Sequence, residues 1–558
     1  MKEFVIILAA LIIAFMIKSA IDEKNRKKQL AEYFRSSFGA YEKNKCADAE
    51  KRNMSHYHRS VNAEAAVDEA TASDLGLDEL FDRINVCRSF YGEEALYDML
   101  RTPVFDMGVL KKRNGLIELF AADPDTRVRL QCALDMIGRD DTMPPVDCIH
   151  GLKALAREHN LTRLAILDRL CLVAGIAACV LIFVKPMAGF FVFFAVLFIN
   201  LLVYFGRKKL IDPQIKCLGA ILRLISAVDV LTQGKTFEGL EDIMEEIKAE
   251  TDVIRPMRRL SFLLTTGRQA MGNLWDVLLD YFRMFLHLDI LRFYSMQNMA
   301  VENGDRIVKL SHMVGELDAC IAVSSYRASL QNVCTPELDG ESLCCKGLCH
   351  PLIENCVPND IDTKKSVLLT GSNASGKSTF LRSVALAAHM AQTIYTVCAA
   401  SYSYRPVRVA SSMAVSDSVT AGDSYYVAEI KSLKRIMDLS KSGPLLCVVD
   451  EVLRGTNTAE RIAASAEILE DLSKRCLCFA ATHDLELAEL LKERYENYHF
   501  TEDVDTVNGG ITFGYKLLPG KAMSRNAIKL LVLMGYDDEI TDRAIDRCVR
   551  FLDTGNWT

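Results

Sequence analysis

The sequence has no excess of basic residues. Its 66 lysines and arginines are outnumbered by 73 aspartates and glutamates, which gives a formal net charge of -7. Nucleic-acid-binding proteins usually carry a basic excess, so the overall charge does not indicate that class of ligand, and only a local basic face would. The 558 residues also contain no internal repeat and no low-complexity segment. A chain of this length and apolar content is typical of about three to five globular units.

The cysteines lack the regular spacing of a small disulfide-bonded secreted domain. There are 18 of them, and several lie inside apolar runs, where a thiol behaves as a small hydrophobic group. Examples are Cys171, Cys179, Cys447 and Cys478. We therefore predict a reducing, cytosolic environment for most of the chain.

The first apolar run is not followed by a signal-peptide cleavage pattern. Phe4–Ile17 is uninterrupted, but at ~1.5 Å per residue it spans only about 21 Å of the ~30 Å hydrocarbon core. Snorkelling by Lys18 and continuation to Ile21 would close the gap. The alternative is a cleaved signal peptide, which has its positive charge before the apolar run, whereas here residues 24–28 are basic. We predict a retained transmembrane anchor at residues 1–21, with the following residues in the cytosol.

Two longer apolar runs, Leu170–Val184 and Met187–Phe205, are separated only by Lys185 and Pro186. This pattern predicts a helical hairpin, and basic residues flank both of its far ends, which places both ends in the cytosol. The alternative is a buried hairpin in a soluble core. The second run has almost no polar residue, which is rare in soluble helices and favours a membrane hairpin at residues 170–205.

The remaining N-terminal sequence has a helical pattern. Residues 22–76 are charged and predict a cytosolic helix and a linker. In residues 77–165 and 210–335, apolar residues recur at three- and four-residue spacing, as in Leu77, Leu80 and Ile84. These two segments predict an all-α region that the membrane hairpin divides.

Residues 366–391 contain the clearest motif. An apolar run from Val367 leads into GSNASGKS, which fits G-x-x-x-x-G-K-[ST], and a helical pattern follows. Glycines let backbone N–H groups surround a phosphate, and the helix adds its positive end. We expect Lys377 to reach the β- and γ-phosphates of ATP and Ser378 to bind Mg²⁺. The predicted ATP-binding residues are Gly371, Ser372, Asn373, Ala374, Ser375, Gly376, Lys377, Ser378 and Thr379.

Two further apolar runs end in polar residues. LLCVVDE ends at Asp450 and Glu451, and CLCFAATHD delivers Thr482 and His483. Buried parallel strands have this pattern, and ligands bind at their carboxyl ends. We predict that Asp450 holds Mg²⁺, that Glu451 orients and deprotonates the attacking water, and that His483 senses the γ-phosphate or that water. A lone histidine is usually structural, so the assignment of His483 depends on the two preceding motifs.

These segments together resemble the ATPase domain of the MutS family. Gly371–Arg382 is similar to the family's T-G-P-N-x-x-G-K-S-T-x-x-R, with Ser372 in place of proline, and Asp450–Thr458 is close to D-E-x-x-R-G-T-x-T. DSVTAGDSYYVAEI looks like the signature stretch ending S-T-F-x-x-E-M, in which Ser424 takes the serine position. The resemblance is dense over residues 340–550 and weaker over 77–335, which looks like the family's helical core and lever.

The resemblance implies a fold and a mechanism. It implies an α/β P-loop NTPase domain of the ABC type at residues 340–555, preceded by an all-α core and lever with transmembrane helices. It also implies a homodimer in which Ser424 contacts the γ-phosphate of the partner's ATP, and loss of that phosphate opens the dimer. The expected location is the cell membrane, multi-pass, with the ATPase domain in the cytoplasm.

The departures from the family leave two hypotheses open. No sequence before residue 75 matches the N-terminal domain that reads mismatched DNA. The first hypothesis is an ATP-driven dimer switch coupled to binding or repair of mismatched DNA. The second is a membrane ATPase scaffold with a protein partner and no DNA. A transporter-type ATPase is disfavoured, because the predicted spans are few and the L-S-G-G-Q signature is absent.

Overall fold

The computed structural model of this chain forms two compact units. The first contains Met1–Ala63, Ile84–Asp98 and Gly115–Ser329, and the second contains Glu64–Arg83, Met99–Asn114 and Leu330–Thr558. The structure describes residues 18, 21–40, 46, 48–61, 66–139, 144–158, 161–232, 237–259, 281–372, 375–413, 425–453, 457–505, 510–521, 528, 531–532 and 534–554. Apart from Lys18 and Ile21, the predicted N-terminal anchor lies outside the described residues.

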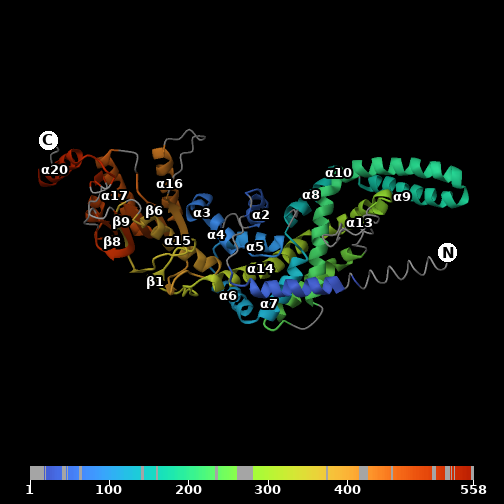
Figure 1. Ribbon diagram of the computed structural model, residues 1–558, viewed down its shortest axis with the longest axis horizontal. Helices are drawn as coiled ribbons and strands as arrows, with labels where there is room; N and C mark the ends of the chain where they lie inside the picture. The colour runs from blue at the N-terminus through green and yellow to red at the C-terminus, as the bar shows by residue number, and fades with distance from the viewer. Residues whose placement is uncertain are drawn as a thin grey trace. The chain divides into compact units, whose positions relative to one another are not determined.

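The first unit is helical, as the apolar periodicity predicts (Figure 1). Residues 21–36 form a helix. The elements that follow are α2 (Asp48–Val61), most of α5 (Phe90–Arg101), part of α6 (Met107–Ala122), α7 (Pro124–Asp135), α8 (Pro145–Glu158), α9 (Leu161–Val184), α10 (Pro186–Thr232), α11 (Glu241–Ile254), η1 (Arg255–Arg258), α13 (Leu288–Glu302) and α14 (Gly304–Ser329). The start of α7 shows a local cause, because Asp123 accepts the N–H groups of Asp125 and Thr126 and Pro124 occupies the first turn.

Helices α9 and α10 form the antiparallel hairpin that the sequence predicts (Figure 1). Both are longer than predicted, with 24 residues in α9 and 47 in α10. Gly189 permits the close turn, because a Cβ there would lie 2.5 Å from the backbone of Ile182. Beyond the apolar run α10 continues, because its second half buries Leu218, Leu224 and Val228 against the other helices of the unit.

The apolar half of the hairpin leaves its side chains exposed. Phe183 is 88% exposed, Met187 78% and Phe191 69%. Arg163–Val184 and Pro186–Asp212 are long and apolar enough to cross a membrane. Length and composition alone are weak evidence, since a core helix of a soluble protein passes the same test, but a core helix would bury these side chains.

One disulfide is present among the described residues. It joins Cys148 of α8 to Cys217 of α10, with a Cα–Cα distance of 6.1 Å, and both side chains are buried. The irregular spacing of the cysteines, which predicts a reducing environment for most of the chain, does not indicate this pair. The two cysteines are 69 residues apart, and only packing of the two helices brings them together.

The second unit is built on a six-stranded sheet with the strand order β5-β6-β7-β3-β8-β9. Its strands are β3 (Ser366–Thr370), β5 (Arg408–Ser412), β6 (Leu445–Asp450), β7 (Leu477–Thr482), β8 (Tyr495–Asp505) and β9 (Gly510–Pro519). The first five in spatial order are parallel, and β9 is antiparallel to β8. A smaller antiparallel sheet has the order β2-β1-β4, from β1 (Leu343–Leu348), β2 (Asn359–Thr363) and β4 (Ser401–Ser403). The C-terminal part is therefore a mixed α/β unit, as predicted.

Helices cover both faces of the large sheet. On one face α15 (Lys377–Thr393) packs against β5, β6 and β7. On the other face, α16 (Tyr425–Leu439), α17 (Thr458–Arg475) and α18 (Leu485–Leu490) pack on the apolar side chains of β6 and β7. The last helix, α20 (Asp538–Thr554), follows the sheet in sequence. Because crossover helices occupy both faces, the central strands are fully apolar rather than alternating.

Two N-terminal segments belong to this second unit. They contain α3 (Glu69–Leu75), most of α4 (Leu77–Ile84), the end of α5 and the start of α6. Asp74 accepts the Ser411 hydroxyl at 2.7 Å and the Met413 N–H at 3.0 Å. These segments fall in the regions expected to be a linker and a helical core, and nothing in their local sequence indicates a partner more than 300 residues away.

Candidate functional site

The glycine loop connects β3 to α15 at the carboxyl end of the parallel strands. Gly371 has φ +143° and Gly376 has φ +109°, conformations that side chains disfavour. A Cβ on Gly371 would lie 2.9 Å from the carbonyl oxygen of Phe500, and one on Gly376 would lie 3.2 Å from the Tyr515 ring. Both glycines are therefore required by the backbone conformation and by close neighbours.

The side chain of Lys377 lies along this loop and is buried. Its Nζ donates to the carbonyl oxygens of Gly371 at 2.8 Å and Ser372 at 2.6 Å, and only 4% of the residue is exposed. The Ser375 hydroxyl also donates to the Ser372 carbonyl, at 2.9 Å. The ammonium group thus sits inside the loop on acceptors that anionic oxygens could replace. Asn373 and Ala374 lie outside the described residues.

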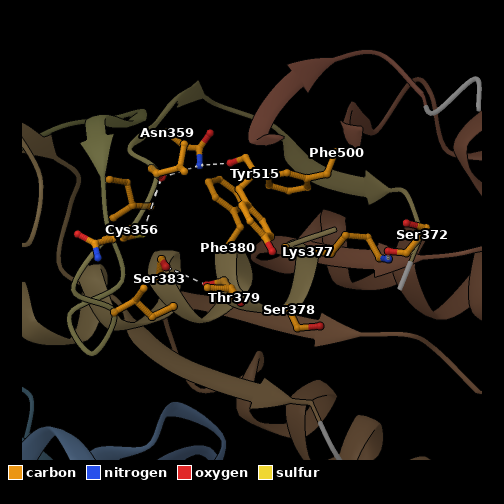
Figure 2. A pocket seen from close by; sticks show the side chains of 15 residues that line it. Cys356, Asn359, Ser372, Lys377, Ser378, Thr379, Phe380, Ser383, Phe500 and Tyr515 are labelled. Atoms are coloured by element: carbon orange, nitrogen blue, oxygen red, sulfur yellow. Dashed lines mark hydrogen bonds between the residues drawn. The ribbon is translucent and has the colours of Figure 1, made fainter. Parts of the chain in front are cut away.

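A cavity of about 510 Å³ lies beside the loop. Figure 2 shows Phe380, Phe500 and Tyr515 grouped next to Lys377. The rings of Phe380 and Phe500 are 5.8 Å apart, and Asn359 holds the wall by donating to the Tyr515 carbonyl at 3.0 Å. The remaining lining residues are Leu348, Ile353, Asn355, Cys356, Val357, Ser372, Gly376, Ser378, Thr379 and Ser383. The cavity therefore joins an apolar, aromatic chamber to a polar loop.

The two strand-end acids lie at the same edge of the sheet as the loop. Asp450 pairs in register with Ala481 of β7, and Thr482 pairs with Thr370 of β3. Glu451 follows directly, and its Oε1 lies 2.5 Å from Nε2 of His483. The structure therefore brings together three predicted residues, Asp450, Glu451 and His483, although their motifs are about 30 residues apart.

The loop after β6 has an unusual backbone. Glu451 has φ +56° and Leu453 has φ +60°, a left-handed conformation that costs a non-glycine residue roughly 1–2 kcal/mol. The Leu453 N–H donates to Oε1 of Glu429 at 2.7 Å, and this carboxylate is only 4% exposed. Glu429 belongs to α16, which begins inside the predicted signature stretch of residues 417–430. Ser424 itself lies outside the described residues.

An ion pair borders the histidine. Arg461 of α17 donates twice to Asp484, at 3.0 and 2.6 Å, and the Asp484 N–H donates to the Thr482 hydroxyl. The hydrogen bonds that Arg461 donates to Asp484 raise the pKa of Arg461, which remains a cation. This pair fixes the segment that carries His483.

The residues present fit a magnesium ion. Ser378, the second residue of α15, is exposed on the cavity wall, and Asp450 ends β6, the strand against which α15 packs. A hydroxyl and a carboxylate are the hard oxygen ligands that Mg²⁺ prefers, and this ion usually keeps several waters. Within the described ranges, no group of three or more His, Cys, Asp or Glu residues gathers as a metal site.

Several cavity residues were not singled out from the sequence. Phe500 lies in β8 and carries no motif signal. Tyr515 lies in β9, Asn359 opens β2 and Cys356 lies in the loop before it, and none of the three belongs to a motif described above. Their common role as cavity walls appears only when β8, β9 and the 353–359 loop fold beside α15.

Comparison with known proteins matches the C-terminal part of the chain to one family. The family profile described as MutS domain V matches residues 367–551. The DNA mismatch repair protein MutS of Natronomonas pharaonis is 31% identical over 271 residues, which is 46% of this chain and 31% of that protein. The proteins of the same name from a Thermotoga strain and from Thermus thermophilus are 32% and 29% identical, over 46% and 45% of this chain and 33% and 31% of theirs. The chain thus spans about a third of the length of these curated relatives.

Proposed function

Because this chain belongs to the MutS family, we propose that its sheet unit binds and hydrolyses ATP at the loop between β3 and α15. The observation that carries the proposal is the buried Lys377 ammonium, held by two loop carbonyls beside a cavity and at the strand edge that bears Asp450 and Glu451. Proteins of this family are ATPases.

In this proposal, the loop binds the phosphates of ATP and the aromatic chamber binds its base. The phosphates take the loop N–H groups and the positive end of α15, and the Lys377 Nζ leaves the two carbonyls for the β- and γ-phosphate oxygens. The base enters the aromatic chamber next to Phe500 and Tyr515. Ser378 and Asp450 would hold Mg²⁺, which supplies charge neutralisation at the phosphate oxygens.

Hydrolysis depends on the pair of Glu451 and His483. The Glu451 carboxylate accepts a proton from the attacking water, and His483, 2.5 Å away, fixes its orientation. The water then attacks the γ-phosphorus in line with the leaving ADP oxygen.

The test compares two variants with a surface control. Lys377→Ala should lose ATP binding, because the ammonium cannot be replaced from elsewhere in the loop. Glu451→Gln should bind ATP with near-normal affinity and lose most of its turnover. Lys474→Ala, on the exposed face of α17, should match the wild type in both assays. Normal turnover in Glu451→Gln would show that the base is assigned wrongly.

We further propose that ATP closes a homodimer, with Ser424 completing the partner's site. The support is the resemblance of residues 417–430 to the family signature. Glu451→Gln with ATP should therefore accumulate as a dimer in sedimentation, whereas Lys377→Ala should stay monomeric. Equal sedimentation of both variants with ATP would refute the switch.

The exposed apolar side chains of α9 and α10 support a membrane location for the hairpin. Deleting residues 1–21 removes the predicted N-terminal anchor and leaves the hairpin. The shortened protein should still resist extraction from membranes by alkaline carbonate. Its release into the soluble fraction would contradict a spanning hairpin.

DNA is the partner suggested by the name of the relatives. The net charge of -7 favours the second candidate, a scaffold with a protein partner. A DNA titration of the full chain with ATP at several salt concentrations distinguishes the DNA-coupled switch from the scaffold. Affinity that falls steeply with salt indicates phosphate contacts, and absence of binding at low salt favours the scaffold.

A further inference from the structure

The base of the hairpin holds a buried polar cluster inside the helical unit. This hairpin-base cluster combines side chains from α9, α10, the segment before α13, and α13 itself. Its members are Asp168, Asn200, Tyr204, Arg207, Lys208, His287, Asp289 and Tyr294. The ATP site does not use these residues. Burial of charged groups beside an apolar hairpin is costly unless every group is paired.

His287 is the centre of the cluster. Neither its side chain nor that of Asp168 is exposed. Nδ1 of His287 lies 2.8 Å from Oδ1 of Asp168, and Nε2 lies 2.9 Å from the backbone carbonyl oxygen of Asn200. The backbone of His287 is left-handed, with φ +56°. A strained residue of this kind persists only where its surroundings hold it.

These two contacts fix the number of protons. A carbonyl oxygen can only accept, so Nε2 carries a hydrogen. A neutral imidazole would then present the bare lone pair of Nδ1 to a carboxylate oxygen at 2.8 Å, and two acceptors repel at that distance. A hydrogen must therefore lie between them, either as imidazolium with carboxylate or as neutral imidazole with a carboxylic acid. The pair thus binds one proton more than a neutral histidine beside an ionised aspartate.

The groups around the second oxygen of Asp168 do not supply the hydrogen that lies between Asp168 and His287. The second oxygen of Asp168 accepts the Tyr294 hydroxyl at 3.1 Å and faces Arg207 at 4.0 Å. Burial and the negative charge of Asp168 raise the pKa of Tyr294, which therefore stays a donor. The Cys171 thiol lies on the same helix near Asp168.

A second set of charges in the cluster lies on α10 and α13. Asp289 accepts the Tyr204 hydroxyl at 2.7 Å and pairs with Lys208 at 3.5 Å. The Tyr204 ring packs edge-on against the His287 ring, with centroids 5.7 Å apart, whereas the Asp289 carboxylate is engaged by Tyr204 and Lys208, so Asp289 serves as an internal comparison.

The same contacts join three segments of chain. Asn200 donates its side-chain amide to the carbonyl oxygens of Cys171 in α9 and Phe285 before α13. Phe285 also packs against Phe193 of α10, with ring centroids 5.4 Å apart. His287 therefore lies where α9, α10 and the chain entering α13 meet, and its two hydrogen bonds close that joint.

We propose that Asp168 and His287 form a proton-binding site whose proton holds the hairpin onto the helical unit. Loss of the proton sets the two acceptors against each other and loosens the joint around residues 285–294. The ligand is a single proton, and the linked change is the attachment of α9 and α10 to α13.

Hydrogen exchange of the full chain in lipid nanodiscs tests this. Protection of peptides covering residues 285–294, corrected for intrinsic exchange, is measured over a pH series that spans the ordinary titration of histidine and cysteine. Linkage to one proton predicts constant protection below the ordinary titration of histidine, and above it a fall of at most about tenfold per pH unit until the folded pair has released its proton. Peptides from α14 should show no such slope.

Asp168→Asn is the decisive variant. Its amide donates to Nδ1 of a neutral His287 while Nε2 still donates to the Asn200 carbonyl, so both histidine hydrogen bonds persist without a titrating proton and the slope should vanish. Asp289→Asn and Cys171→Ser should keep it, since neither touches the histidine nitrogens. A flat wild-type profile, or an unchanged slope in Asp168→Asn, overturns the proposal. If Asp168→Asn does not fold, the wild-type slope and its loss in His287→Gln decide.

Discussion

Replacing Glu429 tests how the loop after β6 is held in a catalytic position. This carboxylate is buried and accepts the N–H of Leu453 at 2.7 Å. The loop it anchors contains two left-handed residues, Glu451 and Leu453. In Glu429→Ala the Leu453 N–H is left without its acceptor, and the loop can relax to ordinary backbone angles.

The magnitude follows from the chemistry of the contact. A hydrogen bond to a charged group contributes about 1.5–3 kcal/mol, and its loss leaves a buried donor unpaired. For a unit of this size, roughly 2 kcal/mol lowers Tm by about 4–8 °C. Relaxation of Glu451 would also separate it from His483, so turnover should fall at least about tenfold, equivalent to ~1.4 kcal/mol.

The assay pairs thermal unfolding with single-turnover ATP hydrolysis and nucleotide binding. Glu429→Ala should lose stability and turnover while binding ATP within about threefold of the wild type, because the phosphate loop is untouched. Glu429→Gln keeps an acceptor oxygen in place and should recover most of both losses. If Glu429→Ala hydrolyses ATP normally, or Glu429→Gln is no better than alanine, the loop does not depend on this hydrogen bond.

Two further predictions concern the sheet unit. Gly376→Ala places a Cβ on a residue with φ +109° and 3.2 Å from the Tyr515 ring. The free energy of unfolding should therefore fall by roughly 1–3 kcal/mol, and the ATP affinity measured by calorimetry should fall too. Unchanged affinity would contradict the loop geometry. Burial lowers the pKa of His389 to about 4 from the ordinary 6.5, and its Nε2 lies 2.6 Å from the Leu100 carbonyl. The folded state disfavours protonation of His389, so neutral His389 adds its full contribution to the free energy of unfolding above pH 6.5. That contribution is lost as pH falls toward 4, by about 3 kcal/mol in all. Chemical denaturation between pH 6.5 and 4 should show the free energy of unfolding falling with pH. His389→Gln, which keeps a donor, should reduce this pH dependence. An equal pH dependence in both proteins would assign it to other groups.

The sequence by itself determined the local chemistry of the candidate site. The glycine loop, the strand-end acids and the fully apolar strands are local patterns, because backbone conformation and burial on both sheet faces restrict residue type at each position. Those patterns sufficed to predict an α/β unit after a helical one, and the family resemblance that the comparisons support. The hairpin was equally visible, since two apolar runs with a two-residue break admit few other structures, although its place in a membrane stays a prediction.

The tertiary structure decided everything that depends on distant residues meeting. The aromatic chamber of Phe500 and Tyr515, the Glu429 contact to Leu453 and the packing of α3 on β5 each join segments with no local signal of a partner. Asp168 and His287 are 119 residues apart, and as isolated residues they are an ordinary acid and an ordinary histidine. Only the folded helices place two acceptors at hydrogen-bond distance from one imidazole, because side-chain packing, not sequence spacing, fixes that distance.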